Sequence, residues 1–277
     1  MADWLQAILL GALQGLTEFL PVSSSGHLVL AQEWLGEDFF ASDNPLFFDL
    51  VLHVGTLLPV FWFYRRELVG ILKSPREAPS LAEAGGLVAW LRGNPSRWMG
   101  VMVLVGSVPT ALIGLTFEDS FESLFSSVGA VCTALVITAL LLIGTAFVKE
   151  RQSGGPISLL AALGIGAVQG LAITPGISRS GSTIAFALFG GFDREQAARF
   201  SFLLSIPAIL GAVVLKTDAS TFGGEVDWLA LGCGFVSSAL VGYLALTLLV
   251  AVVRKGALHR FAGYLIPVAL VGWLFLA

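Results

Sequence analysis

The strongest constraint on this chain is a set of long apolar stretches separated by charged links. Each stretch has about 20 residues, enough for a helix to cross a hydrocarbon core of about 30 Å. The stretches are 46–64, 98–116, 126–148, 195–215, 227–251 and 261–277. Charged residues make up only 12% of the chain, against about 25% in a soluble domain. We therefore expect an all-α polytopic membrane protein whose residues 1–277 form one integral membrane domain.

The links between these stretches differ in the sign of their charge. Links 37–45 and 117–125 hold acidic residues but no lysine or arginine. All basic residues except Arg179 and Lys216 lie in four other links. These basic links are 65–97, 149–155, 191–199 and 252–260. Basic links stay on the cytoplasmic side, so the acidic links and both chain termini are expected outside.

Residues 156–190 lie between two basic links, so this segment must enter and leave the membrane on the same side. Its arms, 156–173 and 180–190, are separated by a segment that contains proline and glycine, which both interrupt helices. The shorter arm reaches about 16 Å, roughly half of the core. Residues 3–36 have the same form, with a break at 21–26. We predict re-entrant helical hairpins at 3–36 and 156–190.

The two hairpins also resemble each other in sequence. A shift of 155 residues aligns 11–26 with 166–181, with eight of the sixteen positions identical. Each hairpin is followed by three spans, an odd number, so the second copy would be inserted upside down. This pattern predicts an inverted-topology repeat, 1–150 and 156–277, whose broken helices meet near the midplane. Irregular backbone at that depth must be buried in protein or line a polar cavity.

The first hairpin tip carries a cluster of polar residues. Gln14 and Glu18 are four residues apart and share a helix face, and an unpaired carboxylate at this depth would be costly. The turn then holds Ser23, Ser24, Ser25, Gly26 and His27. Its hydroxyls can cap the second arm, and its amides point into the tip. Glu18 could be a reactive group or a structural carboxylate, and His27 could be reactive or a packing residue.

The second tip holds Arg179, the one arginine assigned to membrane depth. A guanidinium stays charged and needs an anionic partner. A salt bridge to Glu18 alone would be structural, whereas a fork matched to phosphate oxygens would bind substrate. Ser178, Ser180 and Thr183 surround Arg179, and the helix that starts there adds its positive dipole end. Two helix N-termini, an arginine and several hydroxyls together indicate a phosphate site.

Two further residues are ambiguous, and several known site types are absent from the sequence. Asp49 and His53 are four residues apart at the start of a span, and supporting and purely structural roles are equally open. The sequence has no P-loop, no HExxH, no GxSxG and no basic patch for nucleic acid.

The motifs of both tips resemble those of the undecaprenyl-diphosphate phosphatases, the bacitracin-resistance phosphatases of bacterial membranes. Gln14 and Glu18 resemble that family's (E/Q)xxxE motif, and residues 175–183 match its PGxSRSxxT motif at every fixed position. Residues 15–27 are also similar to its first conserved region, and the order and spacing agree over nearly the whole chain. Many members have Glu at the position of Gln14, and Gln is neither a base nor a strong metal ligand.

The resemblance implies a hydrolase of the bacterial inner membrane that converts undecaprenyl diphosphate to undecaprenyl phosphate and inorganic phosphate. This reaction recycles the lipid carrier for cell-wall synthesis and confers bacitracin resistance. The resemblance also implies a divalent cation, Mg²⁺ or Ca²⁺, with Glu18 as a metal ligand. The expected partner is a polyprenyl diphosphate lipid, with a homodimer left open and no nucleic acid.

Two questions stay open from the sequence. The attacking group could be Ser24, activated by Glu18 or His27, or it could be His27 itself or an activated water, and we favour Ser24. The architecture would also suit a carrier for lipid phosphates or anions, which needs the phosphate clamp but no nucleophile. A purely structural scaffold would leave Arg179 unexplained.

Overall fold

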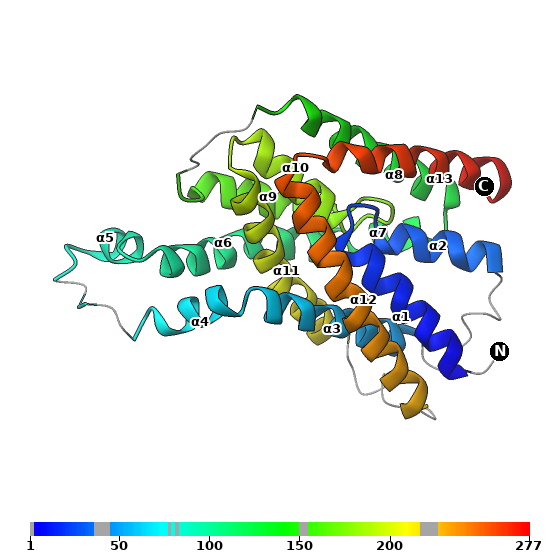
Figure 1. Cartoon of the computed structure of the whole chain (residues 1–277), viewed down its shortest axis with the longest axis horizontal. Coiled ribbons are helices and arrows are strands. Elements are labelled where there is room, and N and C mark those ends of the chain that lie inside the picture. The colour runs from blue at the N-terminus through cyan, green and yellow to red at the C-terminus, as the bar shows by residue number, and fades with distance from the viewer. Residues whose placement is uncertain (1–2, 36–44, 77–78, 81–82, 150–154, 217–226) are drawn as a thin grey trace.

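The computed structural model of the chain consists of helices joined by short links (Figure 1). It describes all residues except 1–2, 36–44, 77–78, 81–82, 150–154 and 217–226. The helices are α1 Asp3–Phe19, α2 Ser24–Leu35, α3 Pro45–Phe63, α4 Arg65–Lys73, α5 Leu87–Arg92, α6 Pro95–Thr116, α7 Glu118–Phe125, α8 Val128–Gly144, α9 Leu159–Leu171, α10 Arg179–Phe189, α11 Arg194–Lys216, α12 Trp228–Arg254 and α13 Ala262–Phe275. Since the described residues contain no strand, the predicted all-α class is confirmed.

Most of the predicted spans appear as long apolar helices. Within the described residues, the helices able to cross a membrane are Pro95–Thr116, Val128–Phe147, Arg194–Lys216, Trp228–Arg254 and Leu258–Phe275. A sixth crossing results if α3 and α4 are taken together, although the chain bends by 79° between them. These positions agree with the six apolar stretches, and the prediction of a polytopic membrane protein is confirmed.

The chain breaks at the two places where hairpin tips were predicted. Helix α2 begins at Ser24, shortly after the end of α1, and α10 begins at Arg179, shortly after the end of α9. Each break contains a residue in the left-handed region, Ser23 with a φ of 70° and Gly176 with a φ of 93°. Glycine adopts this conformation freely, whereas serine rarely does. The first tip therefore needs other contacts to hold its turn.

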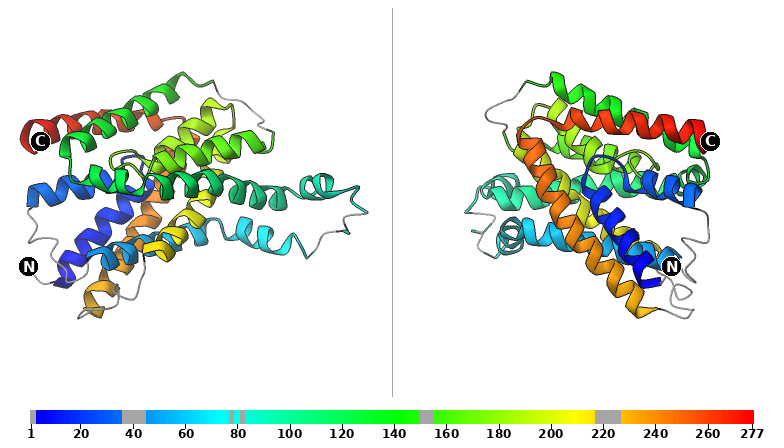
Figure 2. Two further views of the ribbon diagram at one scale, coloured as in Figure 1. Left: turned by 180° about the vertical axis from the view of Figure 1, so that it is seen from behind. Right: turned by 45° about the vertical axis from the view of Figure 1, so that its right-hand side comes forward.

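Each hairpin packs against a helix from the other half of the chain. Helix α1 lies along α12, α9 lies along α6, and α8 packs on α13 (Figures 1 and 2). Gly11 and Gly166, which align in the predicted repeat, lie at the first two contacts. A Cβ on Gly11 would collide with the carbonyl of Gly234, and one on Gly166 with that of Gly106. Glycine at both positions thus allows the helix backbones to approach closely, while the inverted repeat and its boundaries stay predictions.

The two ends of the bundle differ in charge. Helices α4 and α5 lie at one end, and the start of α1 and the end of α13 lie at the other (Figure 1).

Lys216, outside the basic links, lies 2.7 Å from a carboxylate oxygen of Glu122 and 3.9 Å from one of Glu118. Its hydrogen bond lowers the pKa of Glu122. The acidic link 117–125 contains helix α7, whose carboxylates neutralise this lysine.

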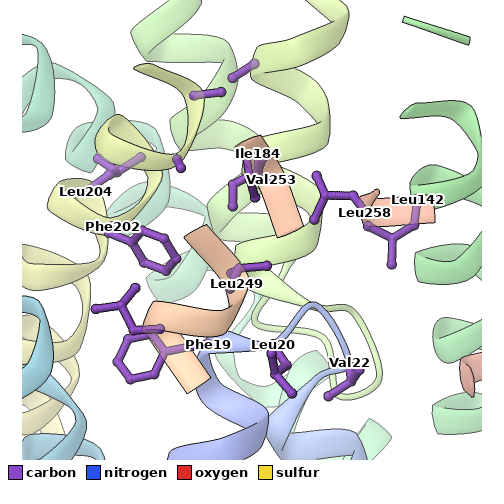
Figure 3. Close-up of a cluster of buried hydrophobic side chains, with 14 of the residues drawn as sticks. Phe19, Leu20, Val22, Leu142, Ile184, Phe202, Leu204, Leu249, Val253 and Leu258 are labelled. Carbon is purple, nitrogen blue, oxygen red and sulfur yellow. The ribbon is translucent and has the colours of Figure 1, made fainter. Parts of the chain in front are cut away.

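A buried apolar cluster surrounds the first hairpin tip and joins it to the long helices (Figure 3). Phe19, at the end of α1, packs edge-on against Phe202 of α11, with ring centroids 5.9 Å apart. Leu20 and Val22 of the turn lie in the same cluster, together with Leu249 of α12. Burial of such a side chain from water contributes about 1.5–3 kcal/mol to stability. Where the surroundings are lipid, this hydrophobic contribution is absent and van der Waals packing between the helices stabilises the contact instead. The apolar part of the tip is thus fixed on both sides.

Candidate active site

The two hairpin tips meet inside the bundle. The Oγ of Ser23 accepts a hydrogen bond from the amide of Gly176 at 3.1 Å, and the Oγ of Ser180 donates to the carbonyl of Leu20 at 3.4 Å. The backbones approach so closely that a Cβ on Gly26 would lie 2.9 Å from the Cα of Gly176. The predicted meeting of the two tips is confirmed, and only small residues allow it.

Glu18 is at the centre of the site. Its Oε1 pairs with the Nη2 of Arg179. Its Oε2 accepts hydrogen bonds from the Oγ of Ser24 at 2.9 Å and from the Nε2 of Gln14 at 3.1 Å. The Glu18 side chain is only 7% exposed, so these partners are what make its burial tolerable. The structure thus unites residues of both tips around one carboxylate.

The site is accessible from the side of Ser24 and Arg179. Ser24, Ser25 and Arg179 are partly exposed, whereas Gln14 is fully buried. Within the described residues, the first-turn amides of Ser24 and Ser25 in α2, and of Arg179 and Ser180 in α10, have no hydrogen-bond partner. Free amides at helix N-termini attract anions. The open side therefore presents a hydroxyl, a guanidinium and two helix N-termini.

His27 is turned away from Glu18. Its Nδ1 contacts the carbonyl oxygen of Ser23 at 2.8 Å, and its Nε2 contacts the hydroxyl of Tyr264 at 2.9 Å. The two rings are stacked, with centroids 5.6 Å apart. Because a carbonyl can only accept, Nδ1 carries the hydrogen and Nε2 accepts from Tyr264. In this arrangement His27 is not placed to take the proton of Ser24, and it supports the left-handed turn at Ser23 instead.

The hydroxyls of the second tip face protein groups. The Oγ of Ser178 caps α10 by accepting from the amide of Gly181 at 3.1 Å. The Oγ1 of Thr183 donates to the carbonyl of Arg179 at 2.8 Å. Ser178, Ser180 and Thr183 are almost completely buried. A phosphate role for these three hydroxyls stays a prediction, and Arg179 is the partly exposed polar residue beside them.

Residues outside the motifs hold both tips in place. Thr138 of α8 donates to the carbonyl of Gly176 at 2.9 Å and accepts from the amide of Ser178 at 3.0 Å. Tyr264 of α13 holds His27. Neither residue is predictable from the sequence, because a single threonine or tyrosine in an apolar span carries no distinctive pattern.

Asp49 and His53, whose roles the sequence left open, lie beside the site on α3. The Nε2 of His53 lies 3.9 Å from the Oε2 of Glu18. The same ring lies against Asp49, with its Nδ1 3.4 Å from a carboxylate oxygen. The structure therefore adds a third element, α3, to the two tips.

A resident divalent cation would need oxygen ligands that other groups do not already use. The described residues contain no group of three or more His, Cys, Asp or Glu side chains that could hold a metal ion. Both oxygens of Glu18 have protein partners, but the Oε1 of Gln14 beside it is buried without one. The site fits a cation only if a bound anion completes the ligand set, as Mg²⁺ often does with phosphates.

Comparison with known proteins agrees with this geometry. A family model described as bacitracin resistance protein BacA matches residues 7–271. The chain belongs to this family. Over 266 residues, 94% of each chain, it is 43% identical to an undecaprenyl-diphosphatase of Desulfatibacillum aliphaticivorans. An undecaprenyl-diphosphatase of Carboxydothermus hydrogenoformans is 43% identical over 270 residues, 94% of this chain and 92% of that one. One from Methanosphaera stadtmanae is 40% identical over 272 residues, 95% of each chain.

Proposed function

We propose that this chain hydrolyses undecaprenyl diphosphate to undecaprenyl phosphate and inorganic phosphate. The observation that carries the proposal is the contact between the Oγ of Ser24 and the Oε2 of Glu18 at 2.9 Å, directly beside Arg179. A nucleophile, a base and a phosphate-binding cation thus share one accessible site. The names of the BacA-family relatives supply the substrate. In a bacterium this reaction recycles the lipid carrier for cell-wall synthesis and confers bacitracin resistance.

The terminal phosphate binds between the N-termini of α2 and α10. Arg179 uses Nη2 for Glu18, which leaves its other N–H groups for phosphate oxygens. The free amides of Ser24, Ser25 and Ser180 add neutral donors and the positive ends of two helix dipoles. These donors are in place before substrate arrives, which is the condition for strong electrostatic stabilisation of a transition state.

In the first step, Ser24 attacks the terminal phosphorus. Its hydroxyl proton passes to Glu18 as the new O–P bond forms, and the bond from phosphorus to the bridging oxygen breaks. Undecaprenyl phosphate leaves and takes the proton from Glu18. A general base of this kind contributes about 10²–10⁴-fold, and Arg179 stabilises the charge on the transferring phosphoryl group.

In the second step, water attacks the phosphoserine. Glu18 removes a proton from this water and returns it to the Ser24 oxygen as the Ser24–phosphorus bond breaks. Inorganic phosphate leaves, and the starting arrangement of Ser24 and Glu18 is restored. His27 does not transfer a proton in this sequence, and its part is to hold the turn through Ser23 and Tyr264.

We also propose that a divalent cation, Mg²⁺ or Ca²⁺, binds together with the diphosphate. Glu18 and the unpartnered Oε1 of Gln14 would hold it, with oxygens of the substrate as the remaining ligands. When bound, the cation neutralises part of the charge of the diphosphate.

The proposed location is the plasma (inner) membrane, with both termini outside. The supporting observations are the basic residues around α4 and α5 at one end of the bundle and the end of α13 at the other (Figure 1). Single cysteines at Gly85, Ser120 and Gly256 should be labelled from the inside, the outside and the inside, and outside labelling at Gly85 would overturn the orientation. A homodimer stays a prediction.

The deciding experiment is release of inorganic phosphate from undecaprenyl diphosphate by the purified chain in detergent, with and without chelator. A hydrolase works there because it needs no second compartment. A carrier would bind the lipid without releasing phosphate, and that outcome would replace hydrolysis by transport as the function of the site. Loss of activity in chelator, restored by Mg²⁺, would support the cation.

A further inference from the structure

His53 is held rigidly beside the site by contacts that do not involve the two tips. Its Nδ1 lies 2.9 Å from the carbonyl oxygen of Asp49 and 3.4 Å from that residue's carboxylate. On either side of His53, the backbone of α3 is fixed by α12. The Oγ of Ser238 donates to the carbonyl of Leu52 at 2.7 Å, and a Cβ on Gly55 would lie 2.8 Å from the carbonyl oxygen of Phe235. The ring therefore has little freedom to move.

The other ring nitrogen of His53, Nε2, faces Glu18 and makes no hydrogen bond to the described residues. The Nε2 lies 3.9 Å from the Oε2 of Glu18, which is too far for a hydrogen bond. It has no other hydrogen-bond partner in the described part of the chain. The His53 side chain is 28% exposed. Gln14, which also contacts the carboxylate of Glu18, is fully buried. The Oγ of Ser24 and the Nε2 of His53 lie 2.9 Å and 3.9 Å from the same Oε2 of Glu18, so one diphosphate is able to contact both.

We propose that His53 binds a non-bridging oxygen of the diphosphate through Nε2, as a substrate contact from α3 beside Ser24 and Arg179. Asp49 acts as a positioning residue that holds Nδ1, so that Nε2 points at the substrate. An imidazole nitrogen and a phosphate oxygen share a proton in a hydrogen bond whichever of them carries it. This inference rests on the proposed function, and it adds a substrate-binding residue outside the two motifs.

A merely structural role for His53 would have different consequences. If the ring served only to tie α3 to the bundle, its loss would lower stability and leave ligand affinity in the folded protein unchanged. The substrate contact predicts the reverse, because Nε2 approaches Glu18 only at 3.9 Å and makes no hydrogen bond within the described residues. Substrate binding should weaken while kcat changes little, since the contact exists before the reaction starts.

The test compares His53→Ala and His53→Gln with the unmodified protein in detergent. Leu58→Ala, an exposed apolar position on the same helix, is the matched control. The probe is methylenediphosphonate, a diphosphate that cannot be hydrolysed, and its affinity is measured by calorimetry. We expect His53→Ala to weaken binding about tenfold or more, the usual range for a hydrogen bond to a charged group. His53→Gln should recover most of the affinity through its amide N–H, and Leu58→Ala should bind normally.

Steady-state kinetics and thermal unfolding complete the test. His53→Ala should raise KM for undecaprenyl diphosphate about tenfold with kcat within about threefold, and its unfolding midpoint should stay near that of Leu58→Ala. Equal affinity for methylenediphosphonate in His53→Ala and the unmodified protein would overturn the proposal. So would a loss of affinity that follows a fall in the unfolding midpoint and is not rescued by Gln. Failure of the unmodified protein to release phosphate would instead refute the proposed function, because the binding measurement does not depend on hydrolysis.

Discussion

The two hairpin tips share a serine cap at the start of their second helix but not their reactive groups. Ser23 and Ser178 align, and each Oγ accepts from the amide three residues later, that of Gly26 at 3.3 Å and that of Gly181 at 3.1 Å. The reactive residues of the first tip align with different residues in the second. Glu18 aligns with Ile173, Ser24 with Arg179, and His27 with Ser182. The shared residues form the two helix caps, and the unshared residues supply the reactive side chains.

The tips also differ in exposure. Ser24, Ser25 and His27 are partly exposed, whereas Ser180 and Ser182 of the second tip are almost completely buried. The first tip supplies a carboxylate and a nucleophile, and the second supplies a guanidinium from a tightly packed surrounding. Two identical tips would bring like charges together. Because the two tips differ in sequence, the carboxylate of Glu18 and the guanidinium of Arg179 are able to face each other.

The largest effect is expected from removal of the nucleophile of the first tip. Ser24→Ala should lower kcat by on the order of 10⁴-fold or more, because loss of a nucleophile removes the covalent route. Ser25 is the next residue, and the second tip has a serine at the equivalent position. The kcat of Ser25→Ala should stay within about tenfold of that of the unmodified protein, which is the cost of one lost hydrogen bond. Phosphate release by both variants is the measurement.

Rapid quench with labelled diphosphate tests the same point chemically. A phosphoserine is stable to acid and labile to base, and it should form in the unmodified protein and not in Ser24→Ala. An acid-labile phosphoenzyme would identify His27 as the nucleophile. An active Ser24→Ala variant without any phosphoenzyme would leave water as the attacker.

The next largest effect is expected from the base. Glu18→Gln should lower kcat by about 10²–10⁴-fold, since the amide cannot accept the proton of Ser24. Gln is nearly isosteric and keeps hydrogen bonds to Ser24 and Arg179, so the protein should still fold. If Glu18→Gln unfolds the protein and the added Arg179→Ala change restores stability, the pair is structural. Thermal unfolding of the single and double variants decides between the two.

A third substitution addresses the cation of the second tip. Arg179→Lys keeps the charge but loses the planar fork, so kcat/KM should fall by about 10²-fold. Arg199→Lys is a suitable control, because Arg199 lies outside both tips, 2.9 Å from Glu195 and 3.8 Å from Glu67 of α4. Near-normal turnover of Arg179→Lys would mean that Arg179 only pairs with Glu18.

Part of this arrangement is predictable from sequence and part is not. Proline, glycine and the serine runs locate both breaks, and the charge of Arg179 at depth requires an anion such as Glu18. The support from Thr138 is not predictable in this way. Thr133, in the same helix, donates to the carbonyl of Gly129 in its own helix at 2.8 Å, whereas Thr138 reaches Gly176. Both threonines look alike in sequence, since the choice depends on which face of α8 meets the second tip.

The smallest expected effect concerns Tyr264, another support that the sequence does not reveal. Tyr264→Phe removes the donor to the Nε2 of His27 but keeps the stacked ring, so turnover should fall about fivefold, equivalent to about 1 kcal/mol. Tyr243→Phe, a partly exposed tyrosine on α12, should be unaffected. Phosphate release measures both, and equal activities would show that the hydroxyl of Tyr264 contributes nothing to the turn.

The packing of α1 against α12 has a consequence for biosynthesis. Helix α1 ends at Phe19, but α12 begins only at Trp228, far later in the chain. At a synthesis rate of about 5–20 residues per second, roughly 10–40 s separate the emergence of these two helices from the ribosome. During that interval the first hairpin, with its carboxylate and serines, has neither Arg179 nor α12 beside it for much of the time. The first hairpin therefore cannot complete its packing, or the site, until the second half of the chain has been synthesised.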